Sequence, residues 1–232
     1  MEQPMKLHSA FTKYGLNVDV ISQCEDISGY KIVVAPEMYV TDEKVVKQLY
    51  DFTEKGGTVI LTNRSGVKNE YNNCIMEQLP TVYRKLVGAY VEEYNPIGYD
   101  AAKVKLADGD VYECRQWCDV LNVETAETVA VYDSEYYKGR AAITRNNYGN
   151  GTAYYIGTVC EKGLYNKLVK DILTDTGIEF IDGIPDNVEI TTRTDKNVIA
   201  RFIFNNTNNT QCFNIDGKEI CLEPFEMKIT LK

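Results

Sequence analysis

Histidine is almost absent from this 232-residue sequence, which narrows the chemistry that the chain can support. His8 is the single imidazole, so a nucleophile activated by histidine would depend on that one residue. A metal centre with several histidine ligands is excluded for the same reason. We expect His8 to be a surface or half-buried residue of an amphipathic N-terminal helix.

Basic residues are outnumbered, and long apolar runs are missing. The 25 Lys and Arg face 34 Asp and Glu, giving a net charge of −9, whereas binding a phosphate backbone requires a basic face. No run approaches the roughly 20 apolar residues of a spanning helix, and residues 1–6 lack the apolar core of a signal peptide. We therefore expect no nucleic-acid or membrane partner and a cytoplasmic location.

Motifs for metals and cofactors are also missing. The seven cysteines are scattered, and only Cys114 and Cys118 lie close, without a second pair to complete a zinc set. Gly56-Gly57 and Gly149-Asn150-Gly151 match neither the dinucleotide fingerprint nor the P-loop. We expect mostly buried, free thiols, and no metal or cofactor.

What is present is an ordinary globular composition, 44% hydrophobic and 25% charged, arranged as an α/β pattern. Residues 31–36 and 58–62 are apolar runs typical of buried parallel strands. Between them, Thr41 can cap a helix that Gly56 ends. This strand–helix–strand unit predicts an open, mostly parallel sheet with flanking helices.

Further elements follow from spacing and turn residues. Asn150-Gly151 predicts a hairpin between strands at 141–144 and 152–158, and residues 183–186 read as a linker before a small antiparallel β domain. The other predicted elements are helices at 5–15, 82–87 and 161–176, and strands at 18–22, 90–94, 188–192, 198–205, 212–215 and 227–231.

Two loops would lie at the carboxyl ends of parallel strands, where ligands bind in α/β sheets: residues 36–40 and 63–70. Ser65 follows a buried strand as a nucleophile would, but it lacks the flanking glycines of a nucleophile elbow and a nearby histidine. The sequence therefore indicates no catalytic residue. Tyr136-Tyr137 and Tyr154-Tyr155 could stack on sugars, although alternation along strands explains them equally well.

Five segments resemble the β-galactosidases of glycoside hydrolase family 42 over nearly the whole chain. They are VVAP at 33–36, GGTVILTNRSGVKNE at 56–70, GAYVEEY at 88–94, YYKGRAAITRN at 136–146 and YGNGTAYYIGT at 148–158. The resemblance implies the trimerisation domain of that family, similar in fold to class I glutamine amidotransferases but non-catalytic, followed by a small C-terminal β domain.

The resemblance implies domains at 1–182 and 187–232 and self-association as a homotrimer. The catalytic glutamates of the family lie in a (β/α)8 barrel that this sequence lacks, so the barrel of a parent enzyme would be a partner. The family's domain begins with a strand that is also missing here, so the chain looks like a fragment with an open sheet edge beside residues 18–21 or 32–35. Strand-end position, charge and aromatic area indicate the following interface or rim residues: Arg64, Ser65, Gly66, Lys68, Asn69, Glu70 and Tyr94.

Two other functions remain open from the sequence. One is a carbohydrate-binding module that uses the tyrosine-rich strands. The other is an amidotransferase-like hydrolase, which would need a serine or cysteine nucleophile and His8 as its partner.

Overall fold

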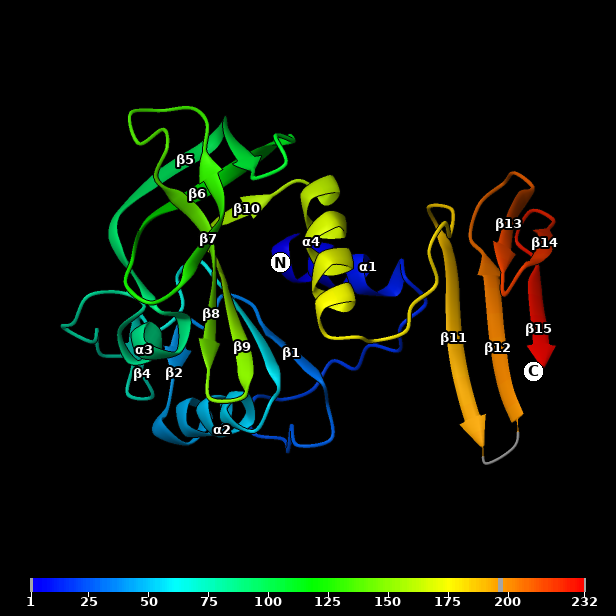
Figure 1. Ribbon diagram of the computed structural model, residues 1–232, viewed down its shortest axis with the longest axis horizontal. Helices are drawn as coiled ribbons and strands as arrows, with labels where there is room; N and C mark the ends of the chain where they lie inside the picture. Colours follow the sequence, from blue (N-terminus) through cyan, green and yellow to red (C-terminus); the bar gives the residue numbers. More distant parts are fainter. Residues whose placement is uncertain (1, 196–197, 232) are drawn as a thin grey trace. The chain divides into compact units, whose positions relative to one another are not determined.

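The computed structural model describes residues 2–195 and 198–231, and the chain divides into two compact units. One unit is Ile21–Glu161, and the other combines Met1–Val20 with Lys162–Lys232. Each unit has its own arrangement of helices and strands, labelled in Figure 1.

The predicted parallel crossover is present in the first unit. Strand β1 (Ile32–Ala35) pairs in parallel with β3 (Thr58–Thr62), and helix α2 (Glu43–Glu54) connects them. Helix α2 is capped by Asp42, whose carboxylate accepts the backbone N–H of Val45 at 2.8 Å, and not by Thr41 as expected.

The rest of this sheet is antiparallel. Its strand order is β1-β3-β9-β8-β7-β5-β6-β10, and β3 pairs in parallel with β9, beyond which every pairing is antiparallel. Because β6 also pairs with β8, strands β5, β6, β7 and β8 close into a barrel-like ring. These strands are β5 (Ala89–Leu106), β6 (Val111–Val123), β7 (Glu127–Tyr132), β8 (Ala141–Tyr148), β9 (Gly151–Ile156) and β10 (Thr158–Cys160).

The expectation of an open, mostly parallel α/β sheet with flanking helices is therefore wrong, and so is the amidotransferase-like fold that the resemblance implied. The crossover at 31–62 accounts for only part of the sheet. The long β5–β6 hairpin and the β8–β9 hairpin are joined by short turns, and strands joined by a short turn pair antiparallel. Strand β1 lies at the edge of the sheet, as expected for the segment 32–35.

Short elements complete the first unit and close its core. Strand β2 (Val40–Thr41) pairs in parallel with β4 (Lys68–Asn69), and η1 (Thr81–Tyr83) leads into α3 (Arg84–Val87). One core cluster joins α2, β3 and the segment around α3, and includes Phe52, Leu61, Tyr83, Leu86, Val91 and Tyr155.

In the second unit, helices α1 (Glu2–Thr12) and α4 (Lys162–Asp175) pack together. The buried Gln3 donates a hydrogen bond to the hydroxyl of Tyr165 at 2.9 Å. Residues 18–22 form no strand, contrary to expectation, and Val20 is 88% exposed there. An apolar residue that is left in water gives no drive to pair as a buried strand.

The remainder of this unit is antiparallel β-structure. Strands β11 (Val188–Asp195), β12 (Val198–Asn205) and β15 (Met227–Leu231) form a three-stranded sheet, and β13 (Gln211–Ile215) pairs with β14 (Lys218–Leu222). A second core cluster joins one face of the sheet to this hairpin: Ile184, Val188, Ile190, Ile203, Phe213, Ile215, Ile220 and Leu222.

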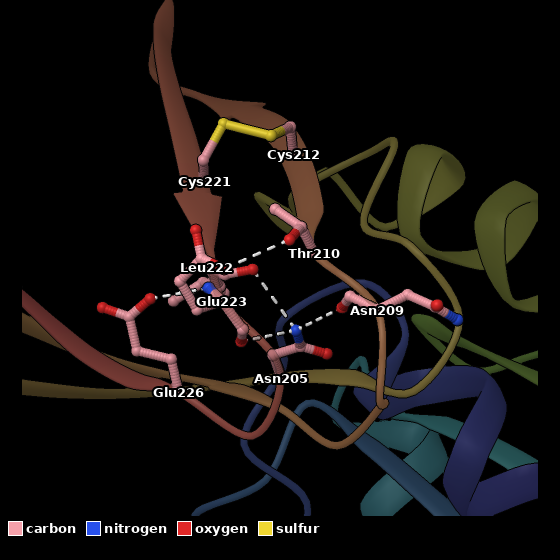
Figure 2. The surroundings of a disulfide bond; sticks show 8 residues. All are labelled: Asn205, Asn209, Thr210, Cys212, Cys221, Leu222, Glu223 and Glu226. Carbon is pink, nitrogen blue, oxygen red and sulfur yellow. Dashed lines mark hydrogen bonds between the residues drawn. A yellow bond between two sulfur atoms is a disulfide. The ribbon is translucent and has the colours of Figure 1, made fainter.

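A disulfide joins Cys212 and Cys221 across the β13–β14 pair (Figure 2). The expectation that all cysteines are free thiols is therefore wrong for this pair, because the cross-strand register places the two side chains directly opposite each other. The amide of Asn205 supports the same region, donating to the carbonyls of Asn209 and Glu223 at 2.8 Å each. Of the remaining cysteines, Cys24 and Cys74 are exposed thiols, and Cys114, Cys118 and Cys160 are buried.

Candidate functional site

The turn after β3 presents the first predicted residue, Arg64, in a fixed conformation. Arg64 has φ of +63°, a left-handed value uncommon for a residue with a side chain. The neighbouring Ser65 is buried, and its hydroxyl donates to the Thr62 carbonyl at 2.8 Å. Gly66 donates its N–H to Met38 O at 2.8 Å. These bonds hold the backbone so that the Arg64 side chain projects from the end of the strand.

The Arg64 guanidinium lies over two aromatic rings. Its central carbon is 4.1 Å from the centre of the Trp117 ring and 5.0 Å from that of Tyr39. Tyr94 stacks on Trp117, with ring centres 5.0 Å apart and planes inclined by 19°. We call Tyr39, Arg64, Tyr94 and Trp117 the Arg64 stack. Lys68 extends it, with Nζ 5.8 Å from the centre of the Tyr39 ring.

A buried carboxylate lies directly behind the stack. Asp119, 1% exposed, accepts hydrogen bonds from Trp117 Nε1 at 2.7 Å, the Tyr155 hydroxyl at 2.8 Å and the Arg64 N–H at 3.3 Å. Burial raises the pKa of Asp119 to about 6, although the hydrogen bonds from Tyr155 and Trp117 oppose that shift. One side chain therefore fixes both the Trp117 ring and the Arg64 turn.

The composition of the stack is typical of protein–protein contact sites. Arg, Trp and Tyr are the residues most enriched at interface hot spots, and Tyr94 is 53% exposed at the outer end. Trp117 is contacted on its ring by both Arg64 and Tyr94, and it is half-buried, as Tyr39 is, whereas Tyr94 is exposed. The arrangement can offer a preorganised cationic and aromatic surface to a partner.

The seven predicted interface residues separate into three groups. The structure brings Arg64, Lys68 and Tyr94 together around the same rings. Asn69 instead organises its own loop, where its side-chain oxygen accepts the N–H groups of Tyr71 and Asn73. The other three differ in exposure: Ser65 and Gly66 are buried, and Glu70 is exposed. An interface role for all seven remains a prediction.

Sequence reasoning missed Tyr39, Trp117 and Asp119. Tyr39 lies in the 36–40 loop that was predicted to reach the strand ends, and Trp117 is the single tryptophan, which was a usable signal. Asp119 gave no signal, because its neighbours Cys118 and Val120 are buried as well and no alternation marks its position.

The residues considered for catalysis or sugar binding differ in their exposure and in their hydrogen bonds. The Ser65 hydroxyl is committed to the Thr62 carbonyl, and His8 is an exposed residue of α1 in the other compact unit. Tyr137 and both Tyr154 and Tyr155 are buried, which leaves only Tyr136 of the four exposed, at 71%.

Residues 2–195 and 198–231 contain no group of three or more His, Cys, Asp or Glu side chains arranged to hold a metal ion. Across that same portion, no helix is both long and apolar enough to cross a membrane.

Comparison with known proteins identifies the family. The profile of the β-galactosidase trimerisation domain matches residues 2–179. The chain belongs to this family, the trimerisation domains of glycoside hydrolase family 42 β-galactosidases, and the match is to that domain rather than to a catalytic domain.

Individual relatives agree with the family match. The chain is 37% identical to the β-galactosidase BgaA of Clostridium cellulovorans, across 99% of its own length and 37% of that protein. It is 30% identical to the β-galactosidase Pbg of Clostridium perfringens, across 98% of its length and 36% of that protein. The chain thus spans little more than a third of these relatives.

A solved structure extends the likeness to both compact units. The β-galactosidase from Bacillus circulans sp. alkalophilus superposes with a TM-score of 0.92 at 27% identity, covering 100% of this chain and 37% of that one. The fold described above is therefore that of a segment found within longer β-galactosidase chains.

Proposed function

We propose that this chain is the assembly region of a β-galactosidase and holds subunits together as a homotrimer, without catalysing a reaction itself. The observation that carries the proposal is the family match over residues 2–179. The parent enzyme would hydrolyse terminal β-galactosides in carbohydrate metabolism, and its catalytic barrel would be the second partner. We further propose residues 1–182 as the trimerisation domain, residues 187–232 as the small β domain, and a cytoplasmic location.

We place the contact between subunits at the Arg64 stack. A closed three-fold assembly uses heterologous contacts, in which two different surfaces of each subunit meet. Arg64, Lys68 and Tyr94 offer charge and aromatic area on one surface, and Asp119 holds that surface in position before binding. Preorganisation lowers the entropic cost of association.

Light scattering on variants tests this placement. We expect Tyr94→Ala to raise the dissociation constant of the assembly at least tenfold, because truncating an aromatic hot-spot residue costs about 2 kcal/mol or more. Tyr99→Ala is the matched control, since Tyr99 is 97% exposed in the same strand and has no place in the stack. If both changes raise the dissociation constant equally, the Arg64 stack is not part of the interface.

A catalytic assay tests the other half of the proposal. The purified chain should release no nitrophenol from a nitrophenyl β-galactoside above the buffer rate. Turnover that persists through repeated purification and is lost in a Ser65→Ala or His8→Ala variant would favour the hydrolase alternative. Heat of binding with millimolar galactose or lactose would favour the carbohydrate-binding alternative.

A further inference from the structure

The three-stranded sheet β11-β12-β15 has a second apolar face. One face lies on the core cluster of its own unit through Val188, Ile190 and Ile203. Neighbouring residues in a strand point to opposite faces, so the cross-strand partners Phe202–Ile229 and Phe204–Met227 lie on the other side. We call this side the outer face: Val198, Ala200, Phe202, Phe204, Met227, Ile229 and Leu231.

The outer face is substantially open to solvent within its own compact unit. Met227 is 49% exposed, Ile229 50% and Leu231 73%, and Phe202 and Phe204 are half-buried. An antiparallel sheet with one face on a core normally presents polar residues on the other. A contiguous group of apolar side chains in that position marks an interaction surface.

Polar residues border the outer face along strand β11. Along β11, the residues opposite Phe204, Phe202 and Ala200 are Glu189, Thr191 and Arg193. The face thus has an apolar centre on β12 and β15 and a polar rim on β11, which is the anatomy of a protein interface. An apolar centre without charged residues is typical of permanent contacts rather than transient ones.

We propose that the outer face packs against the catalytic domain of the parent β-galactosidase. The sheet is part of a fold that superposes over its full length on a chain nearly three times as long, so the face has a counterpart in proteins that carry further structure. A permanent, covalently connected neighbour fits the apolar centre. The inference rests on the proposed function only for the existence of that catalytic partner.

A second copy of this chain fits the outer face less well. Two copies that meet through the same flat face form a two-fold, isologous contact, whereas a trimer is built from heterologous contacts. The Arg64 stack belongs to the unit Ile21–Glu161, so the outer face is free to serve a different partner.

Side-chain accessibility tests the proposal. Ile229→Cys and the control Lys228→Cys are made with Cys24→Ser and Cys74→Ser, which remove the exposed thiols. Lys228 is the adjacent exposed residue of β15 with its side chain on the opposite face. Maleimide labelling is then followed by mass spectrometry in the chain alone and in a chimera in which the chain replaces its matching segment of C. cellulovorans BgaA.

We expect Ile229→Cys to be labelled at least tenfold more slowly in the chimera than in the chain alone, and Lys228→Cys to change less than twofold. The comparison is repeated with the chain mixed with the separately produced remainder of BgaA, so that a misfolded chimera does not decide the result. Equal labelling of Ile229→Cys in all three states overturns the proposal. Protection in the chain alone that grows with its concentration also overturns it, in favour of a second copy.

The outcome is separable from the proposed trimer. Protection of Ile229→Cys in the chimera or the mixture, together with a chain that scatters as a monomer by itself, supports the docking face and refutes self-assembly. A chain that is trimeric by itself, with Ile229→Cys unprotected in the chimera and the mixture, supports self-assembly and refutes the docking face.

Discussion

The guanidinium carbon of Arg64 lies 4.1 Å from the centre of the Trp117 ring, in the range of a cation–π contact. Both residues also donate hydrogen bonds to the same buried carboxylate, Arg64 from its backbone N–H and Trp117 from its indole N–H. The side-chain contact and the backbone turn are thereby coupled through Asp119. Substitutions at these positions can separate the stability of the turn from its role at an interface.

Replacing Arg64 with alanine or with glycine distinguishes the stability of the turn from the role of the side chain in assembly. Both changes remove the guanidinium, so we expect at least a tenfold weaker assembly from each. Only glycine relieves the left-handed backbone at φ +63°, so Arg64→Gly should exceed Arg64→Ala in free energy of unfolding by about 1 kcal/mol. Urea unfolding measures stability, and light scattering measures assembly.

The control is Lys44→Ala, which removes an exposed cation from helix α2 outside the stack. It should leave assembly within about twofold of wild type. An Arg64→Gly variant that assembles as tightly as wild type would contradict a side-chain role for Arg64.

Asp119 predicts a specific pH dependence of stability. Its folded-state pKa of about 6 lies above the unfolded value of about 3.9, so the folded chain binds this proton more tightly than the unfolded chain. The contribution of Asp119 to the free energy of unfolding therefore falls as pH rises through these two pKa values, by about 3 kcal/mol in total between well below pH 4 and well above pH 6. Above pH 6 it stays at the lower level.

Urea unfolding at pH 4, 5, 6 and 7 isolates this contribution. The wild-type free energy of unfolding minus that of Asp119→Asn should fall by about 2 kcal/mol between pH 4 and pH 7, because the variant lacks the titration. A flat difference for Asp119→Asn would mean that Asp119 has an ordinary pKa in the folded protein.

Gly66 tests how tightly the turn is packed. A Cβ at Gly66 would lie 2.5 Å from the Pro80 carbonyl oxygen and 2.7 Å from Thr81 Oγ1, at φ +73°. Gly139 has a similar φ of +87° but nothing within 4 Å of such a Cβ. Gly139→Ala should therefore cost only the backbone strain, about 1 kcal/mol, and Gly66→Ala at least 1 kcal/mol more. Thermal unfolding of both variants measures these losses of stability. Equal losses would contradict the close approach of Gly66 to Pro80 and Thr81.

The disulfide predicts a thiol count. Alkylation of the unfolded, unreduced chain should modify five cysteines, and reduction should expose Cys212 and Cys221 to bring the number to seven. Closing so short a loop stabilises the folded state by about 2–3 kcal/mol, so a reductant should lower the stability of the C-terminal strands by that amount. Seven modified cysteines before reduction would contradict the bond.

The sequence predicted those parts of the fold in which local pattern and long-range pairing agree. The apolar runs at 31–36 and 58–62 pair in parallel as expected, and the Asn150-Gly151 turn joins antiparallel strands. The prediction of an open, mostly parallel sheet failed, because the periodicity of a sequence identifies a strand but not the strand with which it pairs. The 18-residue β5 has register shifts against β6 between residues 91 and 101, and such bulges leave no simple alternation to read.

The candidate site was accessible to sequence reasoning only in part. Arg64 and Lys68 follow a recognisable buried strand, so their position at a strand end could be predicted. Trp117 and Asp119 reach the same place from β6, and that proximity depends on pairings that close the barrel-like ring. No local signal in residues 111–123 specifies those pairings.

The solution mass of the purified chain tests the assembly claim most directly. Light scattering across a dilution series should give a stable species near three times 26.3 kDa. A chain that scatters as a monomer of 26.3 kDa throughout the series would contradict the proposal that this region holds the subunits together by itself.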